Sequence, residues 1–75
     1  MNDKFARFAC IVSASKANVT EYWVMASPPQ QAVVAVQLML GRDWTVALAR
    51  PRLKPSCLER LKLQPDEMRK LSVRP

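Results

Sequence analysis

Two alternating apolar segments near the start of the chain predict two strands. In residues 5–13 the apolar positions repeat with the two-residue period of a strand, and aromatic and β-branched residues are frequent. Residues 19–26 repeat this pattern, and the polar residues 13–18 between the two segments predict a turn and hence a hairpin. To the core we assign one face of each strand: Ala6, Phe8, Cys10, Val12, Tyr22, Val24 and Ala26.

A boundary at residues 27–30 predicts the start of a helix. Ser27 and Gln30 have the spacing of a capping box, and Pro28 suits the first helical position, where no N–H donor is needed. The helix should continue through the apolar residues 32–40 and end at Gly41, the only glycine, because glycine adopts positive φ without a Cβ penalty.

The last third of the chain predicts a strand, a connector and two short helices. Residues 44–49 alternate as a third strand, and two prolines within residues 50–55 indicate an extended connector. Ser56 and Glu59 form a second capping-box pattern, and Pro65 indicates a further helix start. Residues 56–72 are therefore expected to form two helices.

The predicted order β-β-α-β-α-α indicates a small α+β fold with helices packed on a three-stranded, mainly antiparallel sheet. We expect one domain over residues 1–75, made of a ββαβ body (1–49), a basic connector (50–55) and the C-terminal helices (56–72). The third strand could pair with the first, in the antiparallel order 2-1-3, or with the second in parallel. The first pairing is favoured, because parallel sheets need both faces covered.

The composition excludes most catalytic chemistry. The 75 residues include no His, one Gly and two Cys, so a Ser-His-Asp or Cys-His site, a glycine-rich phosphate loop and a zinc site with paired cysteines are not expected. We predict a non-enzyme without metal or cofactor. Cys57 is the one candidate for a reactive group, and a plain packing role explains it more simply.

The number of cysteines and the lengths of the apolar segments give an expectation for the cellular location of the protein. Two cysteines do not make a disulfide framework, and the apolar run after Lys4 and Arg7 is too short for a signal peptide. No stretch has the ~18 apolar residues of a membrane span. We expect a cytoplasmic protein without membrane contact.

The positive charge is concentrated in the C-terminal third. The net charge is +6; residues 1–49 carry four basic and three acidic residues, whereas residues 50–75 carry eight and three. Such asymmetry suits nucleic acid, an acidic protein surface or a nucleic-acid-associated protein. The first functional hypothesis is therefore a binding or regulatory module that contacts nucleic acid through Arg50, Arg52, Lys54, Arg60, Lys62, Arg69 and Lys70.

A second hypothesis starts from large apolar residues that fall off the assigned core face: Phe5, Ile11, Val19, Trp23 and Met25. Such a patch predicts a protein-interaction module, for example an accessory subunit or inhibitor, and this chain length fits proteins of phages and mobile elements. The C-terminal helices could cover the patch in a three-layer monomer, or a homodimer could bury it. Both arrangements stay open at this point.

Overall fold

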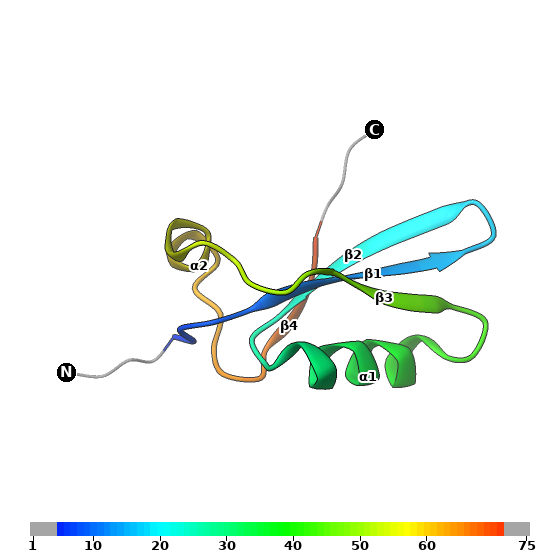
Figure 1. Cartoon of the computed structure of the whole chain (residues 1–75), viewed down its shortest axis with the longest axis horizontal. Helices are drawn as coiled ribbons and strands as arrows, with labels where there is room; N and C mark the ends of the chain where they lie inside the picture. Colours follow the sequence, from blue (N-terminus) through cyan, green and yellow to red (C-terminus); the bar gives the residue numbers. More distant parts are fainter. Residues whose placement is uncertain (1–4, 72–75) are drawn as a thin grey trace.

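The strands of the computed structural model form one antiparallel sheet in the order β3-β1-β2-β4 (Figure 1). The structure describes residues 5–71. Within them the elements are β1 (Cys10–Lys16), β2 (Val19–Met25), α1 (Pro29–Leu40), β3 (Thr45–Arg50), α2 (Pro55–Leu61) and β4 (Met68–Leu71). The predicted α+β fold and the antiparallel pairing of the third strand with the first are confirmed. The sheet has four strands, so the predicted three-stranded sheet is wrong.

The fourth strand occupies the segment where a second C-terminal helix was expected. The chain turns at Pro65 and Asp66, where Asp66 has a φ of 65°, and then runs along the free edge of β2. Two backbone hydrogen bonds join the turn to Ala26: its N–H donates to Glu67 (3.0 Å) and its carbonyl accepts from Asp66 (2.9 Å). Because backbone groups at a sheet edge need partners, pairing with β2 prevails over the weak helix-start pattern.

The hairpin is tighter and starts later than the sequence pattern indicated. β1 begins at Cys10 and not at residue 5, and a two-residue turn, Ala17 and Asn18, joins it to β2. Residues 13–16 belong to the strand; the Ser15 and Thr20 hydroxyls form a cross-strand hydrogen bond of 3.3 Å. The short turn fixes a register that pairs Val12 with Trp23. It therefore places those two side chains on one face.

This register gives the sheet two covered faces in place of the single core face predicted. On one face α1 packs against β1, with a buried cluster of Cys10, Val12, Ala14, Ala32 and Val36. On the other face α2 and its flanking segments close a second cluster, made of Ala9, Val24, Ala26, Leu53 and Leu63. The molecule is thus three-layered, with α1 and α2 on opposite sides of the sheet (Figure 1). Phe8, assigned to the core from the alternation, is half exposed because it lies before β1 begins.

Both helices begin without the expected serine caps. α1 begins at Pro29 with Pro28 as its N-cap, and the hydroxyl of the buried Ser27 donates to the Pro28 carbonyl (3.1 Å). α2 likewise begins at Pro55, one residue before Ser56. In each case a proline takes the first helical position, and the N-cap residue before it is Pro28 or Lys54. Neither serine is therefore at the N-cap position, where its side chain could cap the helix.

The predicted end of α1 at Gly41 is confirmed. Gly41 has a φ of 101° and its N–H donates to the Gln37 carbonyl (2.8 Å). The Gln37 side-chain amide donates to the carbonyls of Gly41 (2.7 Å) and Trp44 (2.9 Å). The glutamine therefore ties the end of α1 to the start of β3.

Candidate nucleic-acid interface

Ion pairs divide the basic residues of the described chain into two groups. Lys16 pairs with Asp43, Arg69 with Glu67, and Lys70 with Glu21. No ion pair within residues 5–71 involves the cations of residues 50–62, which are all exposed: Arg50, Arg52, Lys54, Arg60 and Lys62. The only acidic residue in this segment is Glu59, which is also exposed and lines the same cleft as Lys62. Five cations therefore face solvent without an ion pair within thirteen consecutive residues, and we call them uncompensated in this sense. We call these five residues the cationic set.

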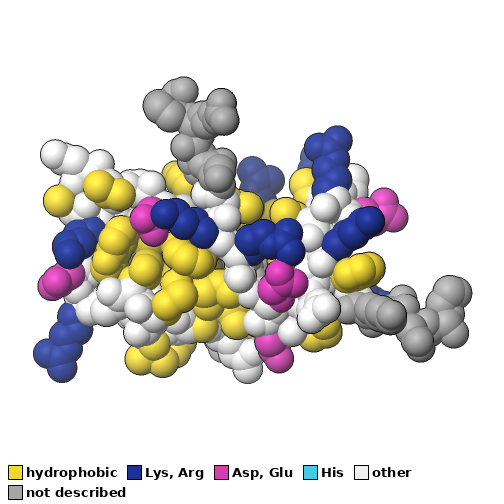
Figure 2. Space-filling model, turned by 180° about the vertical axis from the view of Figure 1, so that it is seen from behind, with side chains coloured by type: hydrophobic (Ala, Val, Ile, Leu, Met, Phe, Trp, Pro, Cys, Tyr) yellow, Lys and Arg dark blue, Asp and Glu magenta, His cyan; other side chains and the backbone are white. Residues whose placement is uncertain are grey.

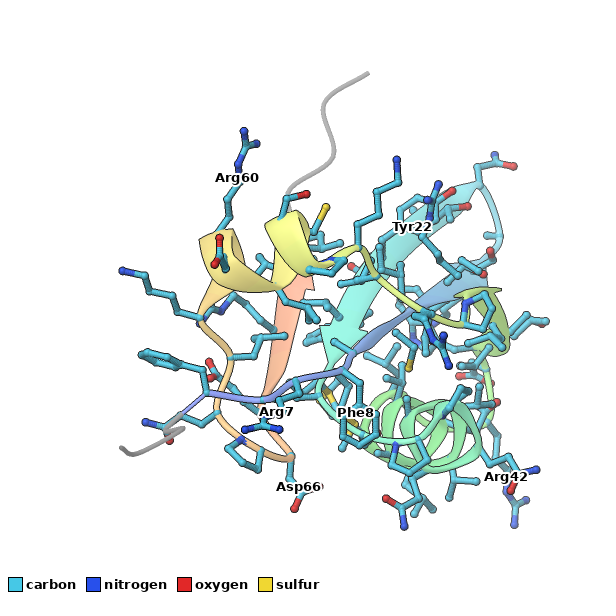
Figure 3. The ribbon with its side chains drawn as sticks, turned by 60° about the vertical axis from the view of Figure 1, so that its left-hand side comes forward. Arg7, Phe8, Tyr22, Arg42, Arg60 and Asp66 are labelled. Atoms are coloured by element: carbon cyan, nitrogen blue, oxygen red, sulfur yellow. The ribbon has the colours of Figure 1, made fainter. Side chains whose placement is uncertain are left out.

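The cationic set is carried by the α2 side of the molecule. Arg50 ends β3 opposite Ile11, and Arg52 and Lys54 lie on either side of the buried Leu53. Arg60 is in the last turn of α2 and points away from the sheet (Figure 3), and Lys62 follows the helix with a φ of 50°. Arg42 lies at the other end of the molecule, beside the end of α1 (Figure 3).

Two buried leucines hold this segment at its ends. The Leu53 N–H donates to the Ala9 carbonyl (3.1 Å), and the Leu63 carbonyl accepts from the Ala6 N–H (2.6 Å). Both leucine side chains enter the second cluster, whereas α2 itself contributes no fully buried residue. The connector is therefore more buried than the extended segment that its two prolines indicated. The anchoring contacts come from the two leucines and do not involve a cation.

The two cations of β4 have different surroundings from the cationic set. Lys70 is paired with Trp23 in the sheet register, so its side chain leaves on the α1 side and reaches Glu21 at 3.1 Å. Arg69 is on the α2 side, but its guanidinium is engaged in a local network. The seven residues proposed from the sequence therefore separate into five uncompensated and two paired cations.

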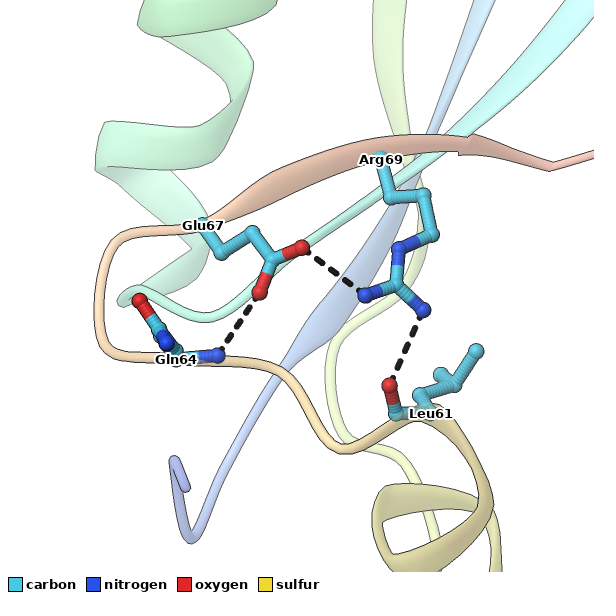
Figure 4. Close-up of polar contacts among 4 residues, drawn as sticks. All are labelled: Leu61, Gln64, Glu67 and Arg69. Carbon is cyan, nitrogen blue, oxygen red and sulfur yellow. Dashed lines mark hydrogen bonds and ion pairs between the residues drawn. The ribbon is translucent and has the colours of Figure 1, made fainter. Parts of the chain in front are cut away.

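The Arg69 network fixes the turn before β4 (Figure 4). The guanidinium donates to the Leu61 carbonyl (2.9 Å) and to the Glu67 carboxylate (2.8 Å), and that carboxylate also accepts from the Gln64 N–H (2.8 Å). The Gln64 N–H and then Arg69 lower the pKa of Glu67 below its ordinary value of 4.5. The network ties the end of α2 to β4 and has a structural role.

A cleft lies between the N-terminal segment and α2, a feature that sequence reasoning missed. Its volume is about 690 Å³ and its lining residues are Phe5, Ala6, Arg7, Pro55, Leu58, Glu59 and Lys62. Phe5 is 47% exposed, so an aromatic ring accessible to solvent lies in the same cleft as Lys62. Residues 5–7 and 55–62 are far apart in the chain. The hydrogen bond from the Ala6 N–H to the Leu63 carbonyl and the packing of Ala6 and Leu58 on the same cluster bring them together.

The apolar patch predicted from the sequence does not form as one surface. Trp23 and Met25 pack on the α1-side cluster, whereas Ile11, paired with Val24, packs on the α2-side cluster. Phe5 lies in the cleft and Val19 is exposed beside the hairpin turn. The face assignment behind that patch is wrong because the two-residue turn places Ile11 on the face opposite Trp23.

Comparison with known proteins gives no match: no family model, curated protein or solved structure is significantly similar to this chain. Across residues 5–71, no three His, Cys, Asp or Glu side chains are grouped as ligands for a metal ion. In the same part of the chain, neither helix has the length and apolarity to cross a membrane.

Proposed function

We propose that this protein is a non-catalytic nucleic-acid-binding module whose contact surface is the cationic set. The observation that supports this is the separation of charge: the acidic residues Glu21, Asp43 and Glu67 pair with cations elsewhere, and the five residues of the set stay uncompensated. Lys and Arg side chains bind phosphates and release the counterions condensed on them, which is the main source of affinity for nucleic acid.

The cleft beside α2 favours a single strand over a duplex. A single strand exposes its bases, which stack on aromatic rings while cations bind the backbone. Phe5 offers such a ring, and Lys62 in the same cleft offers a phosphate contact. A duplex keeps its bases stacked inside, so it would contact the cations but leave Phe5 unused.

The proposal is tested with a charge-matched pair of triple variants. The test variant replaces Arg50, Arg52 and Lys54 by Ala, and the control replaces Lys16, Arg42 and Lys70 by Ala. Both lower the net charge from +6 to +3, so the total charge lost is the same at two different locations. The control also breaks the Lys16–Asp43 and Lys70–Glu21 ion pairs, so circular dichroism checks that it is folded. Fluorescence anisotropy with labelled single-stranded and duplex oligonucleotides, at several salt concentrations, gives the affinity and its salt dependence.

The test variant should bind more weakly and lose up to about two to three units of slope in log K against log salt, because each phosphate contact contributes about 0.7–0.9. The control should keep most of the slope. Equal losses in both variants would mean that only net charge matters, and no binding by the parent chain at low salt would exclude the proposed function. Phe5→Ala should weaken single-strand binding at unchanged slope, since stacking involves no counterion.

A further inference from the structure

Within residues 5–71, Glu59 is the one acidic residue that lines the cleft beside α2. Its sequence position indicated a capping box with Ser56, but α2 has no side-chain cap. No hydrogen bond or ion pair in the same part of the chain involves the Glu59 carboxylate. A carboxylate repels phosphate, so among five cations it weakens a surface that binds phosphate alone. Glu59 is therefore suited to hydrogen-bond donors of a ligand, and the bases of a nucleic acid carry such donors.

The cleft combines an apolar interior with charged groups at α2. Its residues from the α2 segment follow the i, i+3, i+4, i+7 spacing of one helix face: Pro55, Leu58, Glu59 and Lys62. Ala6 and Leu58 are half-buried on the second cluster, whereas Phe5, from the N-terminal segment, is 47% exposed. Figure 2 shows basic, acidic and apolar side chains close together at this end of the molecule, on the right. An aromatic ring, a carboxylate and an ammonium group thus line one cleft.

The Watson–Crick edges of the bases differ in the donors that they offer to a carboxylate. A carboxylate has two oxygens, and both only accept hydrogen bonds. Guanine offers two adjacent donors, the ring N1–H and the N2 amino group, which match the two oxygens. Adenine and cytosine each offer one amino group beside a ring nitrogen that accepts, and the single ring N–H of thymine or uracil lies between two carbonyls. Guanine is therefore the base that a carboxylate binds best.

We infer that the cleft selects guanine in a bound single strand, and that Glu59 is the residue that determines this specificity. The base stacks on Phe5, the Glu59 carboxylate accepts hydrogen bonds from its two donors, and Lys62 contacts a neighbouring phosphate. The cleft volume of about 690 Å³ lies within the ~300–1,000 Å³ of small-ligand sites, so there is room for one base and its sugar. This inference rests on the proposed function and adds base selectivity to it.

Fluorescence anisotropy of the full chain at low salt, with labelled single strands, tests the inference. Each strand is a run of thymines, or of uracils in the RNA series, with one central guanine, inosine, adenine or cytosine. The parent should bind the guanine strand about fivefold to tenfold more tightly than the others, which is the lower part of the range for a bidentate base contact. Inosine lacks the N2 amino group, so its strand should bind like the adenine strand. The tighter series, DNA or RNA, identifies the sugar that the site accepts.

A matched pair of variants assigns the selectivity to Glu59. Glu59→Gln should remove the guanine preference, because an amide presents one acceptor and one donor group in place of two acceptors. It should leave the slope of log K against log salt unchanged, since Glu59 contacts no phosphate. Asp66→Asn is the control: it removes the same charge from an exposed residue outside the cleft lining and should keep the preference. Circular dichroism checks that both variants are folded.

Equal binding of all the strands by the parent would overturn this inference and leave the proposed function standing. No binding of any strand would overturn both. An inosine strand bound as tightly as the guanine strand would also overturn the inference, because only one of the two donors would then be used. So would a guanine preference that survives in Glu59→Gln or is lost in Asp66→Asn.

Discussion

On the α1 side of the sheet, a twelve-residue helix buries Ala32 and Val36 directly against β1. On the α2 side, a seven-residue helix buries no residue of its own and is held by Leu53 and Leu63 at its flanks. One helix thus closes the core, while the other is a short segment supported at both ends. The first exposes only uncharged residues and the second is surrounded by cations.

The difference shows that a chain of this size can cover the two faces of one sheet in two ways: with a helix that packs into the core, or with a short helix that is anchored at its flanks. A small domain buries a limited area, so both faces must contribute to stability. Where the anchoring comes from the flanks, as with Leu53 and Leu63, the residues between them are free to vary in charge. Where the helix itself forms the core, its composition is constrained by packing.

The largest expected difference between the two sides is in the reactivity of the two thiols. Cys57 on α2 is exposed, whereas Cys10 is fully buried and burial raises the pKa of its thiol. In a time course with a thiol reagent, Cys57 should react at once. Cys10 should react at least about a thousandfold more slowly, because the reagent reaches its thiol only when the protein unfolds. A Cys57→Ser control should retain only the slow phase. Two fast thiols would show that the α1-side core is open.

Removing an anchor should destabilise the α2 side strongly. Leu63 is 1% exposed, and Leu63→Ala should lower the free energy of unfolding by about 2–5 kcal/mol through lost contacts and the cavity left behind. Leu48→Ala, the same change at an exposed site, should stay within about 0.5 kcal/mol. Urea unfolding followed by circular dichroism measures both. Similar values for the two would contradict the anchoring role of Leu63.

The link from α1 to β3 should depend on the backbone of Gly41. Its φ of 101° lies in a region that only glycine occupies readily, so Gly41→Val should cost about 1–3 kcal/mol. No atom lies within 4 Å of an added Cβ, so the loss comes from backbone strain and not from a clash. Gly41→Ala should therefore melt close to Gly41→Val, and a parent-like melting temperature for either variant would refute the strain.

The stability of the protein should not depend on the side chain of Ser56 at the start of α2. A capping box would make Ser56→Ala cost about 0.5–2 kcal/mol, but α2 has no side-chain cap and begins at Pro55. We therefore expect a change within about 0.5 kcal/mol in thermal or urea melts. A loss above about 1 kcal/mol would restore the cap that the sequence pattern indicated.

The smallest effect concerns Glu67, whose pKa is lowered in the folded protein. A lowered pKa means that the carboxylate stabilises the fold at pH values above its unfolded pKa. This contribution is lost as the pH falls from about 4.5 through the folded pKa. Melting temperatures between about pH 3 and about pH 6 should fall less steeply for Glu67→Gln than for the parent. Parallel curves for the two proteins would contradict the network of Figure 4.

Local signals in the sequence were enough for the main elements. The alternation of residues 19–26 predicted β2 nearly to its end. Gly41 marked the end of α1 because glycine is the residue that readily adopts the positive φ found there. The concentration of positive charge after residue 49 is likewise visible without a structure. Each of these features depends on neighbouring residues only.

The tertiary structure alone decided the fourth strand and the allocation of residues to faces. A four-residue strand such as β4 is too short to show a clear alternation of apolar and polar residues in the sequence. It forms because the edge of β2 offers backbone N–H and carbonyl groups as hydrogen-bond partners. A two-residue turn at Ala17 and Asn18 set the register, and a shift of one residue reverses every side chain of a strand. For the same reason the pairing of Lys70 with Glu21, 49 positions apart, could not be foreseen. Pairings between distant segments depend on the whole fold, whereas composition, alternation and helix ends are properties of the local chain.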